Sequence, residues 1–341
     1  MPEQKYCDAV FEGGGIKGIG LAGAIAVTEG LGYEFFNVAG TSAGAIVAAL
    51  VAAGYRAKEL HAIMQTLDYS KFKDEGLLDK IPLIGKIASL GLEKGIYEGA
   101  YLEAWIREKL EAKGKRTFKD LVIEECKDSP KYRYKLQVIA SDVSRGKFLV
   151  LPRDITDYGV DPDELDIAKA VRMSMSIPLF FEPVTLTLKD AQEPCYIVDG
   201  GVLSNFPIHL FDDGTADPPW PTFGYLLAES PDSDGRAVSH GISGPFSLLV
   251  SIFFTMMEAH DRIYIQNGAF ARTIMIPTLG VKATEFELSS ERAEALYRSG
   301  EEAARTFFRT WDFDRYKAMF REVRERDRSE MLLAAAPPVR V

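Results

Sequence analysis

A serine flanked by glycines stands where a strand-like stretch gives way to an apolar, helix-like stretch. Residues 40–44 read Gly-Thr-Ser-Ala-Gly and fit the pattern G-x-S-x-G. At a strand-to-helix turn, this pattern holds the serine in a strained backbone conformation, while Gly40 and Gly44 let neighbouring chains pass closely. The N-terminus of the following helix adds partial positive charge. Ser42 is therefore a candidate nucleophile for acyl transfer, although a serine that only caps a helix fits the same five residues.

A serine hydroxyl is a weak nucleophile near neutral pH, so a base must take its proton. Asp199 is the strongest candidate, because it ends an apolar strand-like stretch and is followed by Gly200 and Gly201. In a parallel sheet that end faces the same crevice as Ser42, and burial would raise its pKa from about 3.9. An aspartate that stabilises a β-turn is the alternative. No histidine stands in a turn after a predicted strand, where a triad histidine is expected; the four are His61, His209, His240 and His260.

Three consecutive glycines, Gly13 to Gly15, occupy the first predicted strand-to-helix turn, and Gly18 follows them. Attack by Ser42 on an acyl carbonyl places negative charge on oxygen, and unobstructed backbone N–H groups stabilise that charge. A dinucleotide phosphate could use the same loop, but that fingerprint requires an acidic residue about 20 positions later, at the end of the next strand. Here the next strand ends in the serine motif. The amides of Gly13, Gly14 and Gly15 are therefore predicted to form an oxyanion hole.

The elements that must position these residues follow from the apolar periodicity. Strand-like residues 5–11 and 33–40 each lead through a glycine turn into a helix, which indicates a parallel sheet with helices on its faces. Residues 212–245 predict a long surface loop. Further helices are predicted over 57–67, 98–113, 246–270 and 289–309, and another before Pro178. A hairpin is predicted within 131–152, and strands are predicted at 195–199 and 271–277.

Three motifs in a fixed order resemble those of the patatin-like phospholipase family: Gly-Gly-Gly-x-Lys-Gly, G-x-S-x-G and a distant Asp-Gly-Gly. The segment Arg-Met-Ser-Met-Ser-Ile-Pro before Asp199 resembles the family as well, and the likeness covers about residues 5–210. It implies a three-layer α/β/α sandwich around a mainly parallel sheet. It also implies a Ser42–Asp199 dyad without histidine that hydrolyses acyl esters of lipids. Lys17 stands where the family has Arg or Lys.

Composition limits the partners and the compartment. Fifty acidic residues against 40 basic ones give a formal charge of −10, which argues against a nucleic-acid partner. The three cysteines are scattered, so we expect neither a disulfide framework nor a metal site, and no cofactor is predicted. The absence of a signal peptide and of a run of about 20 apolar residues predicts a cytoplasmic protein. Residues 211–333 are expected to complete the same domain as 5–210, and 334–341 to form a flexible tail.

Residues 76–97 intersperse leucine and isoleucine with Lys80, Lys86 and Lys94, a composition suited to an anionic membrane surface. Transient contact with a membrane that presents a phospholipid or other acyl lipid is one interpretation, and leucines packed on the core are the other. The predicted activity is that of a phospholipase A or lysophospholipase-type esterase. An acyltransferase with the same acyl-serine chemistry and a non-catalytic lipid-binding module remain the alternatives.

Overall fold

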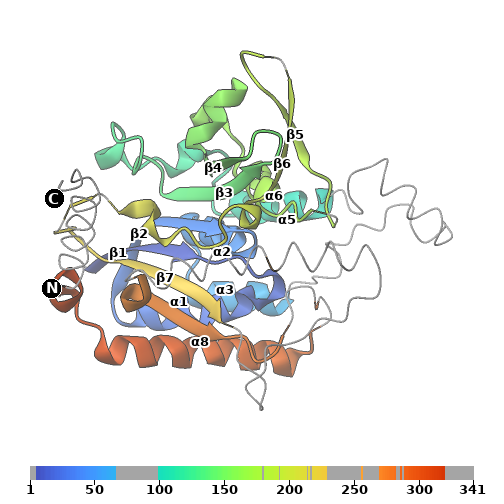
Figure 1. Ribbon diagram of the computed structural model, residues 1–341. Helices are drawn as coiled ribbons and strands as arrows, with labels where there is room; N and C mark the ends of the chain where they lie inside the picture. Colours follow the sequence, from blue (N-terminus) through green and yellow to red (C-terminus); the bar gives the residue numbers. More distant parts are fainter. Residues whose placement is uncertain are drawn as a thin grey trace, which may run out of the picture.

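The computed structural model describes residues 5–66, 99–228 except 179, 192, 213 and 216, and also 255, 269–281, 285 and 288–318. In these residues an eight-stranded sheet has the order β5-β6-β3-β2-β1-β7-β8, with β4 paired to β3 (Figure 1). The strands are β1 (Lys5–Phe11), β2 (Tyr33–Thr41), β3 (Leu136–Asp142), β4 (Lys147–Leu151), β5 (Val184–Thr187), β6 (Pro194–Asp199), β7 (Thr222–Ala228) and β8 (Thr273–Pro277).

The sheet is parallel through its centre and antiparallel at one side. The strands β3, β2, β1, β7 and β8 run parallel, as the repeated strand, glycine turn and helix predicted. In contrast, β4 and β6 run antiparallel to β3, and β5 runs antiparallel to β6. The predicted hairpin is confirmed as β3 and β4, whereas β5 was not predicted.

The helices are α1 (Ile19–Gly30), α2 (Ala43–Ala52), α3 (Ala57–Thr66), α5 (Ala100–Glu111), α6 (Ile167–Ser174) and α8 (Ser290–Thr310).

Two hydrophobic clusters lie on opposite faces of the sheet. Because successive strand residues face opposite sides, Phe11 joins a large cluster with the helices, whereas Val10 joins a smaller one. The smaller cluster includes Phe206, Ile208 and Phe211, in and next to the short 3₁₀ helix η9 (Ile208–Phe211). Helical segments thus cover both faces, and the predicted three-layer α/β/α sandwich is confirmed.

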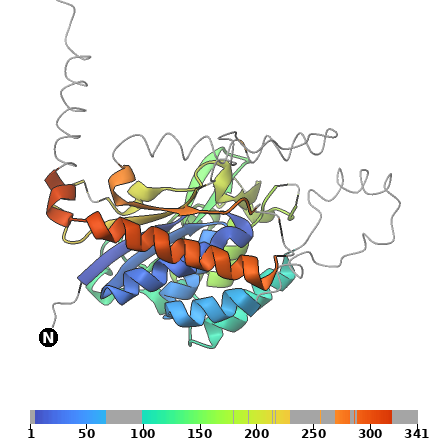
Figure 2. The ribbon, with the colours of Figure 1, turned by 90° about the horizontal axis from the view of Figure 1, so that it is seen from below.

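The small residues of α1 allow α8 to lie against it, as Figure 2 shows. A Cβ added to Gly23 would stand 1.9 Å from the Tyr297 carbonyl oxygen, and one added to Gly300 would stand 1.9 Å from the Gly20 carbonyl oxygen. The two helix backbones therefore approach more closely than any side chain would permit. The predicted charged helix over 289–309 is confirmed as α8.

The predicted surface loop over 212–245 is wrong where β7 lies. Residues 222–228 form a buried strand between β1 and β8, one strand in from the edge of the parallel region. The strand follows a Pro-rich stretch, which gave its surroundings the composition of a loop. Residues 229–245, most of the predicted helix over 246–270 and the tail over 334–341 lie outside the described residues.

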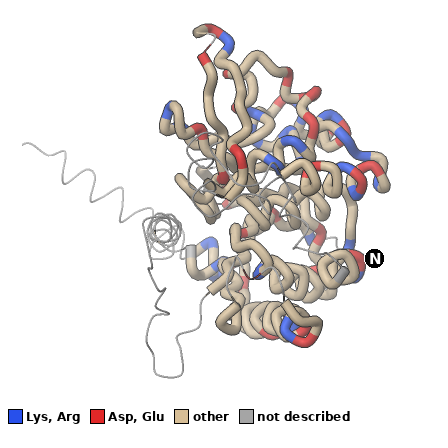
Figure 3. Tube along the Cα trace, turned by 90° about the vertical axis from the view of Figure 1, so that its right-hand side faces the viewer, with Lys and Arg blue, Asp and Glu red and all other residues tan. Residues whose placement is uncertain are grey.

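Charged positions are interspersed along the described chain, with basic and acidic residues close to one another (Figure 3). Many of them pair across neighbouring segments, such as Arg133 with Asp163 at 2.8 Å and Lys147 with Asp157. Among the described residues, no helix has the length and the apolar character needed to cross a membrane.

Candidate active site

Ser42 occupies the turn between β2 and α2 in a backbone conformation that side chains rarely adopt. Its φ is 53° and its ψ is −127°, and it is one of two described residues other than glycine with positive φ. Such a conformation costs about 1–3 kcal/mol and persists only when the surrounding structure imposes it. A Cβ added to Gly44 would lie 2.3 Å from the Phe11 carbonyl oxygen, and one added to Gly40 would lie 2.1 Å from the Gly44 carbonyl oxygen. The glycines of the motif therefore allow the close packing that holds Ser42 in place.

The carboxyl ends of β2 and β6 meet along one edge of β3. Val138 and Ile139 pair with both β2 and β4, while Ala140 pairs with both β4 and β6. Consequently β4 occupies one edge of β3, and β2 followed by β6 occupies the other. Thr41 stands opposite Ile139 and Asp199 stands opposite Ala140, the next residue. Ser42 and Asp199 are therefore brought together by two strands that point toward each other.

This arrangement corrects one detail of the expectation from sequence. Asp199 was placed at the end of a parallel strand, but β6 is antiparallel to β3. The ends of β2 and β6 still converge, because the two strands follow each other on one edge of β3 and run in opposite directions. Gly200 keeps the chain close to β3 at this point: a Cβ added there would lie 2.5 Å from the Ile139 carbonyl oxygen.

The end of α6 connects the two candidate residues. The backbone N–H of Ser42 donates to Ser174 Oγ at 2.9 Å, and the backbone N–H of Asp199 donates to the Ser176 carbonyl oxygen at 2.9 Å. Between them, Met175 Sδ accepts from the Ser42 hydroxyl at 3.6 Å. Residues 174–176 thus fix the positions of Ser42 and Asp199 relative to each other.

Arg172 anchors this connection from the same helix. Its guanidinium donates to Ser176 Oγ at 2.5 Å and to the Glu182 carbonyl oxygen at 3.0 Å, and its side chain is buried. The sequence predicted a helix in this segment and a resemblance to a family, but it gave no role to Arg172, Ser174 or Ser176. The serines and the arginine recur at every second position, a spacing that indicates nothing by itself in a predicted helix.

Asp199 is a fully buried carboxylate with one free oxygen. Oδ1 accepts from the Gly201 N–H at 2.8 Å, whereas Oδ2 has no hydrogen-bond donor among the described residues. Burial raises the pKa of Asp199 to about 7, while the nearby Ser42 hydroxyl and the Gly201 N–H favour the ionised form and limit the rise. The Ser42 hydroxyl donates to Met175 Sδ at 3.6 Å and lies close enough to Asp199 to lower its pKa. Among the described residues, Oδ2 therefore remains available to accept a hydrogen bond.

The glycine loop lies directly against Ser42. A Cβ added to Gly13 would stand 2.9 Å from Ser42 Cβ and 2.2 Å from Asn205 Oδ1, so only glycine fits there. Gly15 has a φ of 58°, which also favours glycine. Within the described part of the chain, the backbone N–H groups of Gly13 and Gly14 donate to no protein acceptor. Unused donors next to the serine are what a developing oxyanion requires.

Asn205 and Glu12 hold the glycine loop in position. The Asn205 amide donates to the Gly13 carbonyl oxygen at 3.2 Å and to Glu12 Oε1 at 3.3 Å. The other oxygen of Glu12 accepts from the backbone N–H of Leu227 in β7. Sequence reasoning missed both residues, because Asn205 lies six positions after Asp199 and nothing in its surroundings indicates a contact with residue 13.

Lys17 and Gly18 support the loop from the short 3₁₀ helix η1 (Gly15–Gly18). Lys17 is buried, and its Cβ would lie 3.6 Å from a Cβ added to Gly14. Gly18 faces Ala43, the first residue of α2. Lys17 thus packs beside the glycine loop, and Gly18 packs against the start of α2, next to the serine turn.

The described histidines stand apart from this site. His61 Nε2 lies 3.1 Å from Glu294 Oε2, and its ring stacks on Tyr297. Neither His61 nor His209 is a hydrogen-bond partner of Ser42 or Asp199, and His240 and His260 lie outside the described residues. Within the described ranges, no group of His, Cys, Asp and Glu could hold a metal ion.

A family model described as patatin-like phospholipase matches residues 9–212, a range that includes Ser42, Asp199 and the glycine loop. The chain belongs to the patatin-like phospholipase family. The family range nearly coincides with the 5–210 over which the sequence motifs indicated a resemblance. It ends before β7, so the last two strands of the parallel region and α8 lie beyond the matched residues.

Two proteins with similar sequences extend this comparison. The uncharacterized protein YqhO of Bacillus subtilis (strain 168) is 40% identical over 309 residues, which is 90% of this chain and 100% of that protein. The probable lipid hydrolase 463L of Invertebrate iridescent virus 6 is 28% identical over 208 residues, which is 60% of this chain and 63% of that protein.

A solved structure shares the fold. The crystal structure of VipD from Legionella pneumophila superposes with a TM-score of 0.51 at 18% sequence identity, over 90% of this chain and 67% of that one. The match extends well beyond residue 212, so the likeness includes the C-terminal part of this chain. At this level of identity the likeness concerns the fold.

Proposed function

We propose that this protein is a lipid acyl hydrolase in which Ser42 is the nucleophile and Asp199 the base. The observation that carries the proposal is the meeting of β2 and β6 on β3, which sets a strained serine beside a buried carboxylate with a free oxygen. Family membership supports a lipid ester as substrate. The name of the viral relative, a probable lipid hydrolase, supports the same substrate class.

In the first half of the reaction, Asp199 Oδ2 accepts the proton of the Ser42 hydroxyl while Oγ attacks the acyl carbon. The N–H groups of Gly13, Gly14 and Gly15 stabilise the carbonyl oxygen as it becomes negative. The tetrahedral intermediate collapses with cleavage of the ester C–O bond, and Asp199 returns its proton to the departing alcohol. The products of this half are the free alcohol and an acyl ester of Ser42.

In the second half, Asp199 takes a proton from water, whose oxygen attacks the acyl-Ser42 carbonyl. The bond between the acyl carbon and Ser42 Oγ then breaks as Asp199 returns the proton to Oγ, which releases the fatty acid and restores the free serine. The pKa of about 7 suits both halves, since a carboxyl that titrates near the working pH can accept and return a proton. Arg172, Ser174 and Ser176 act as positioning residues, because they hold the backbones of the dyad.

We propose that residues 5–210 and 211–333 form one catalytic domain. The strands β7 and β8 extend the sheet that carries Ser42, and the N–H of Leu227 in β7 holds Glu12 beside the glycine loop. The C-terminal part would therefore contribute to the oxyanion hole, although its own residues do not touch the serine.

The two alternative functions are less well supported. A histidine-assisted acyltransferase would need a histidine beside Ser42, and the described histidines contact neither Ser42 nor Asp199. A non-catalytic lipid-binding module would have no need for a strained serine or for unused donors next to it.

The substrate class can be tested with a panel of phospholipids, lysophospholipids and triacylglycerols, with the released acid identified by mass spectrometry. Release of fatty acid from a phospholipid or lysophospholipid supports phospholipase A or lysophospholipase-type activity. Transfer of the acyl group to an added alcohol in place of water would favour the acyltransferase, and no release from any lipid would contradict the proposal.

We expect kcat/KM for a neutral, water-soluble p-nitrophenyl ester to rise with pH and to level off above about 7. Asp199 must be ionised to act as a base, and its pKa is raised to about 7 by burial. Below that value activity should fall about tenfold per pH unit. The measurement is a rate profile between about pH 5 and 9.

Asp8 provides the control for this profile, because burial raises its pKa to about 7 as well. Asp8→Asn should keep the inflection if Asp199 causes it. A profile that is flat across neutral pH, or an inflection that disappears in Asp8→Asn, would contradict the assignment of the base.

We also propose a transient contact between residues 76–97 and a membrane surface, from their composition alone, since they lie outside the described residues. Leu83→Asp combined with Ile84→Asp should lower activity on anionic vesicles much more than activity on a soluble ester. Vesicle substrate must first be engaged at the surface, where each buried CH₂ contributes about 0.8 kcal/mol. Equal loss on both substrates with a lowered Tm would place these side chains in the core instead.

A further inference from the structure

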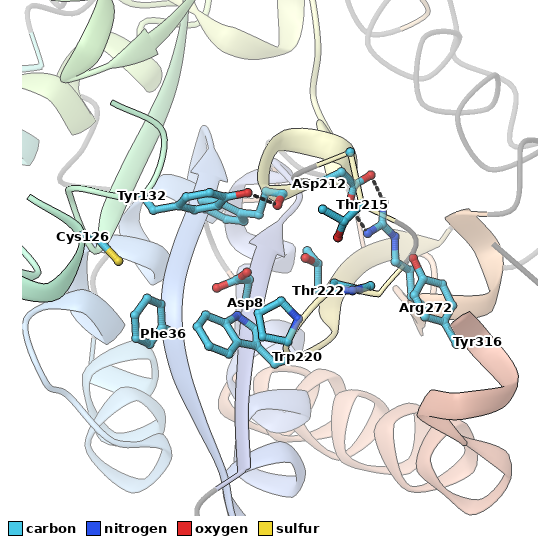
Figure 4. A pocket seen from close by; sticks show the side chains of 14 residues that line it. Asp8, Phe36, Cys126, Tyr132, Asp212, Thr215, Trp220, Thr222, Arg272 and Tyr316 are labelled. Atoms are coloured by element: carbon cyan, nitrogen blue, oxygen red, sulfur yellow. Dashed lines mark hydrogen bonds and ion pairs between the residues drawn. The ribbon is translucent and has the colours of Figure 1, made fainter. Parts of the chain in front are cut away.

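A cavity of about 160 Å³ lies away from Ser42 and Asp199, near the start of β7. Asp8 of β1, Thr222 of β7 and Arg272 just before β8 contribute to it, together with aromatic side chains (Figure 4). An interior space of about 150 Å³ accommodates a ligand the size of benzene. None of the residues of the candidate active site lines this cavity.

Asp8 supplies a buried carboxylate without a basic partner. It is 5% exposed, and among the described residues no lysine or arginine forms an ion pair with it. Oδ1 accepts from the backbone N–H of Asn37 at 2.9 Å, where the pairing of β1 with β2 shifts register between Cys7 and Ala9. The Trp220 indole N–H is a second, neutral donor to the carboxylate. Burial raises the pKa of Asp8 to about 7, while these two donors and the charge of Lys131 favour the ionised form and limit the rise.

Aromatic rings surround the Asp8 carboxylate. Figure 4 shows the carboxylate between the ring of Tyr132 on one side and the rings of Trp220 and Phe36 on the other. The Phe36 and Trp220 centroids are 4.5 Å apart, and the Tyr132 hydroxyl donates to the Phe211 carbonyl oxygen at 3.0 Å. These contacts fix the rings before any ligand enters. Ring faces attract cations, and a cage of rings is the usual receptor for alkylated ammonium groups.

The basic group at the cavity is already neutralised. Arg272 forms two parallel bonds with Asp212, Nη1 to Oδ1 at 2.5 Å and Nη2 to Oδ2 at 2.7 Å. Its side chain is only 5% exposed. This bidentate pair occupies the guanidinium, and Lys131, whose charge also acts on Asp8, donates to the Asp212 carbonyl oxygen and does not line the cavity. Among the residues that line the cavity, an ionised Asp8 is therefore the charge without an ion-pair partner. A phosphate or carboxylate ligand would lie against that negative charge.

We propose that this cavity binds a small organic cation, an alkylated ammonium, with Asp8 as counter-ion and Phe36, Tyr132 and Trp220 as its aromatic cage. The same chemistry occurs in a free quaternary amine and in the choline headgroup of a lipid. The site does not depend on the proposed hydrolase activity, because it shares no residue with the dyad or the glycine loop. Occupancy would stabilise the pairing of β1 with β7 at Asp8 and Thr222, where the cavity lies.

The experiment uses the full chain and isothermal titration calorimetry with tetramethylammonium and choline as probes. The control ligand is 3,3-dimethylbutan-1-ol, which has the shape of choline without its charge. We expect both cations to bind with millimolar or better affinity and the neutral alcohol to bind at least about tenfold more weakly. Absence of cation binding at millimolar concentrations, or equal binding of the neutral alcohol, would overturn the proposal.

Two variants assign the binding to this cavity. Asp8→Asn keeps an oxygen for the Asn37 N–H but removes the charge, and it should weaken choline binding at least about tenfold. Phe36→Leu removes one ring face without a change in charge and should also weaken it. The matched controls are Asp190→Asn and Phe270→Leu, at exposed positions outside the cavity.

If Asp8→Asn does not fold, Phe36→Leu with its control Phe270→Leu still decides the question. Choline binding unchanged in both cavity variants, or weakened equally in the controls, would overturn the assignment. Glycerophosphocholine distinguishes the two sources of the cation. Tighter binding than choline supports a lipid headgroup, weaker binding supports a free amine, and both outcomes support a cation site.

Discussion

Ser42→Ala and Asp199→Asn are each expected to lower ester hydrolysis by at least about 10⁴-fold, because a nucleophile and its base act as a unit. The two residues stand at the facing ends of β2 and β6, opposite consecutive residues of β3. Alanine removes the attacking oxygen. Asparagine keeps the acceptor for the Gly201 N–H but cannot take a proton. Hydrolysis of p-nitrophenyl esters and of a lysophospholipid measures the loss.

Stability measurements separate loss of chemistry from loss of fold. The pKa of Asp199 is raised in the folded protein, so the folded state binds more protons than the unfolded chain between about pH 4 and 7. The contribution of Asp199 to stability therefore falls as pH rises through that window. Asp199→Asn, which is always neutral, should have a Tm at pH 8 that is no lower than that of the wild type.

Ser204→Ala is the matched control for Ser42→Ala. Ser204 is also buried, and its hydroxyl has no hydrogen-bond partner among the described residues. Its replacement should leave turnover within about twofold, since a buried hydroxyl without a hydrogen-bond partner stabilises neither the fold nor the site. Turnover close to the wild-type rate by Ser42→Ala or Asp199→Asn would contradict the proposed dyad.

Gly14→Val is expected to lower kcat by about 100-fold or more, with a smaller effect on KM. A Cβ at this position would stand 2.5 Å from Leu227 Cδ1, so the leucine side chain must move, and the branched side chain of valine would crowd the acyl carbon beside Ser42. Gly15→Val should have a similar effect, because the positive φ at residue 15 disfavours a branched side chain.

Gly30→Ala is the control for these glycine variants. It lies at the end of α1, and a Cβ added there would meet no atom within 4 Å. This variant should keep full activity and an unchanged Tm. If Gly14→Val kept full esterase activity and instead lost affinity for a nucleotide, the loop would be a phosphate site and not an oxyanion hole.

Local signals in the sequence were sufficient to select the residues of the candidate site. Ser42, Asp199 and Gly13 each follow a strand at a glycine-containing turn, and strand ends in an α/β fold converge at one edge of the sheet. The glycines at 40 and 44 were expected to allow close approach, and the 2.1 Å and 2.3 Å distances of their added Cβ atoms show why.

The rest depends on long-range packing that no local pattern records. The strand β6 runs antiparallel to β3, and β7 lies between β1 and β8. Neither arrangement can be read from the residues of the strand alone. Asn205 and Arg172 act through partners that only the fold brings near. An apolar strand after several prolines stands in a stretch with the composition of a loop, so β7 was missed.

The most direct test of the central claim is covalent labelling of the intact protein with a fluorophosphonate, followed by peptide mapping by mass spectrometry. We expect one equivalent of label per chain, attached to Ser42, and much slower labelling in Asp199→Asn because the base is lost. Label on another residue, or labelling of Ser42 at an unchanged rate in Asp199→Asn, would contradict the Ser42–Asp199 dyad.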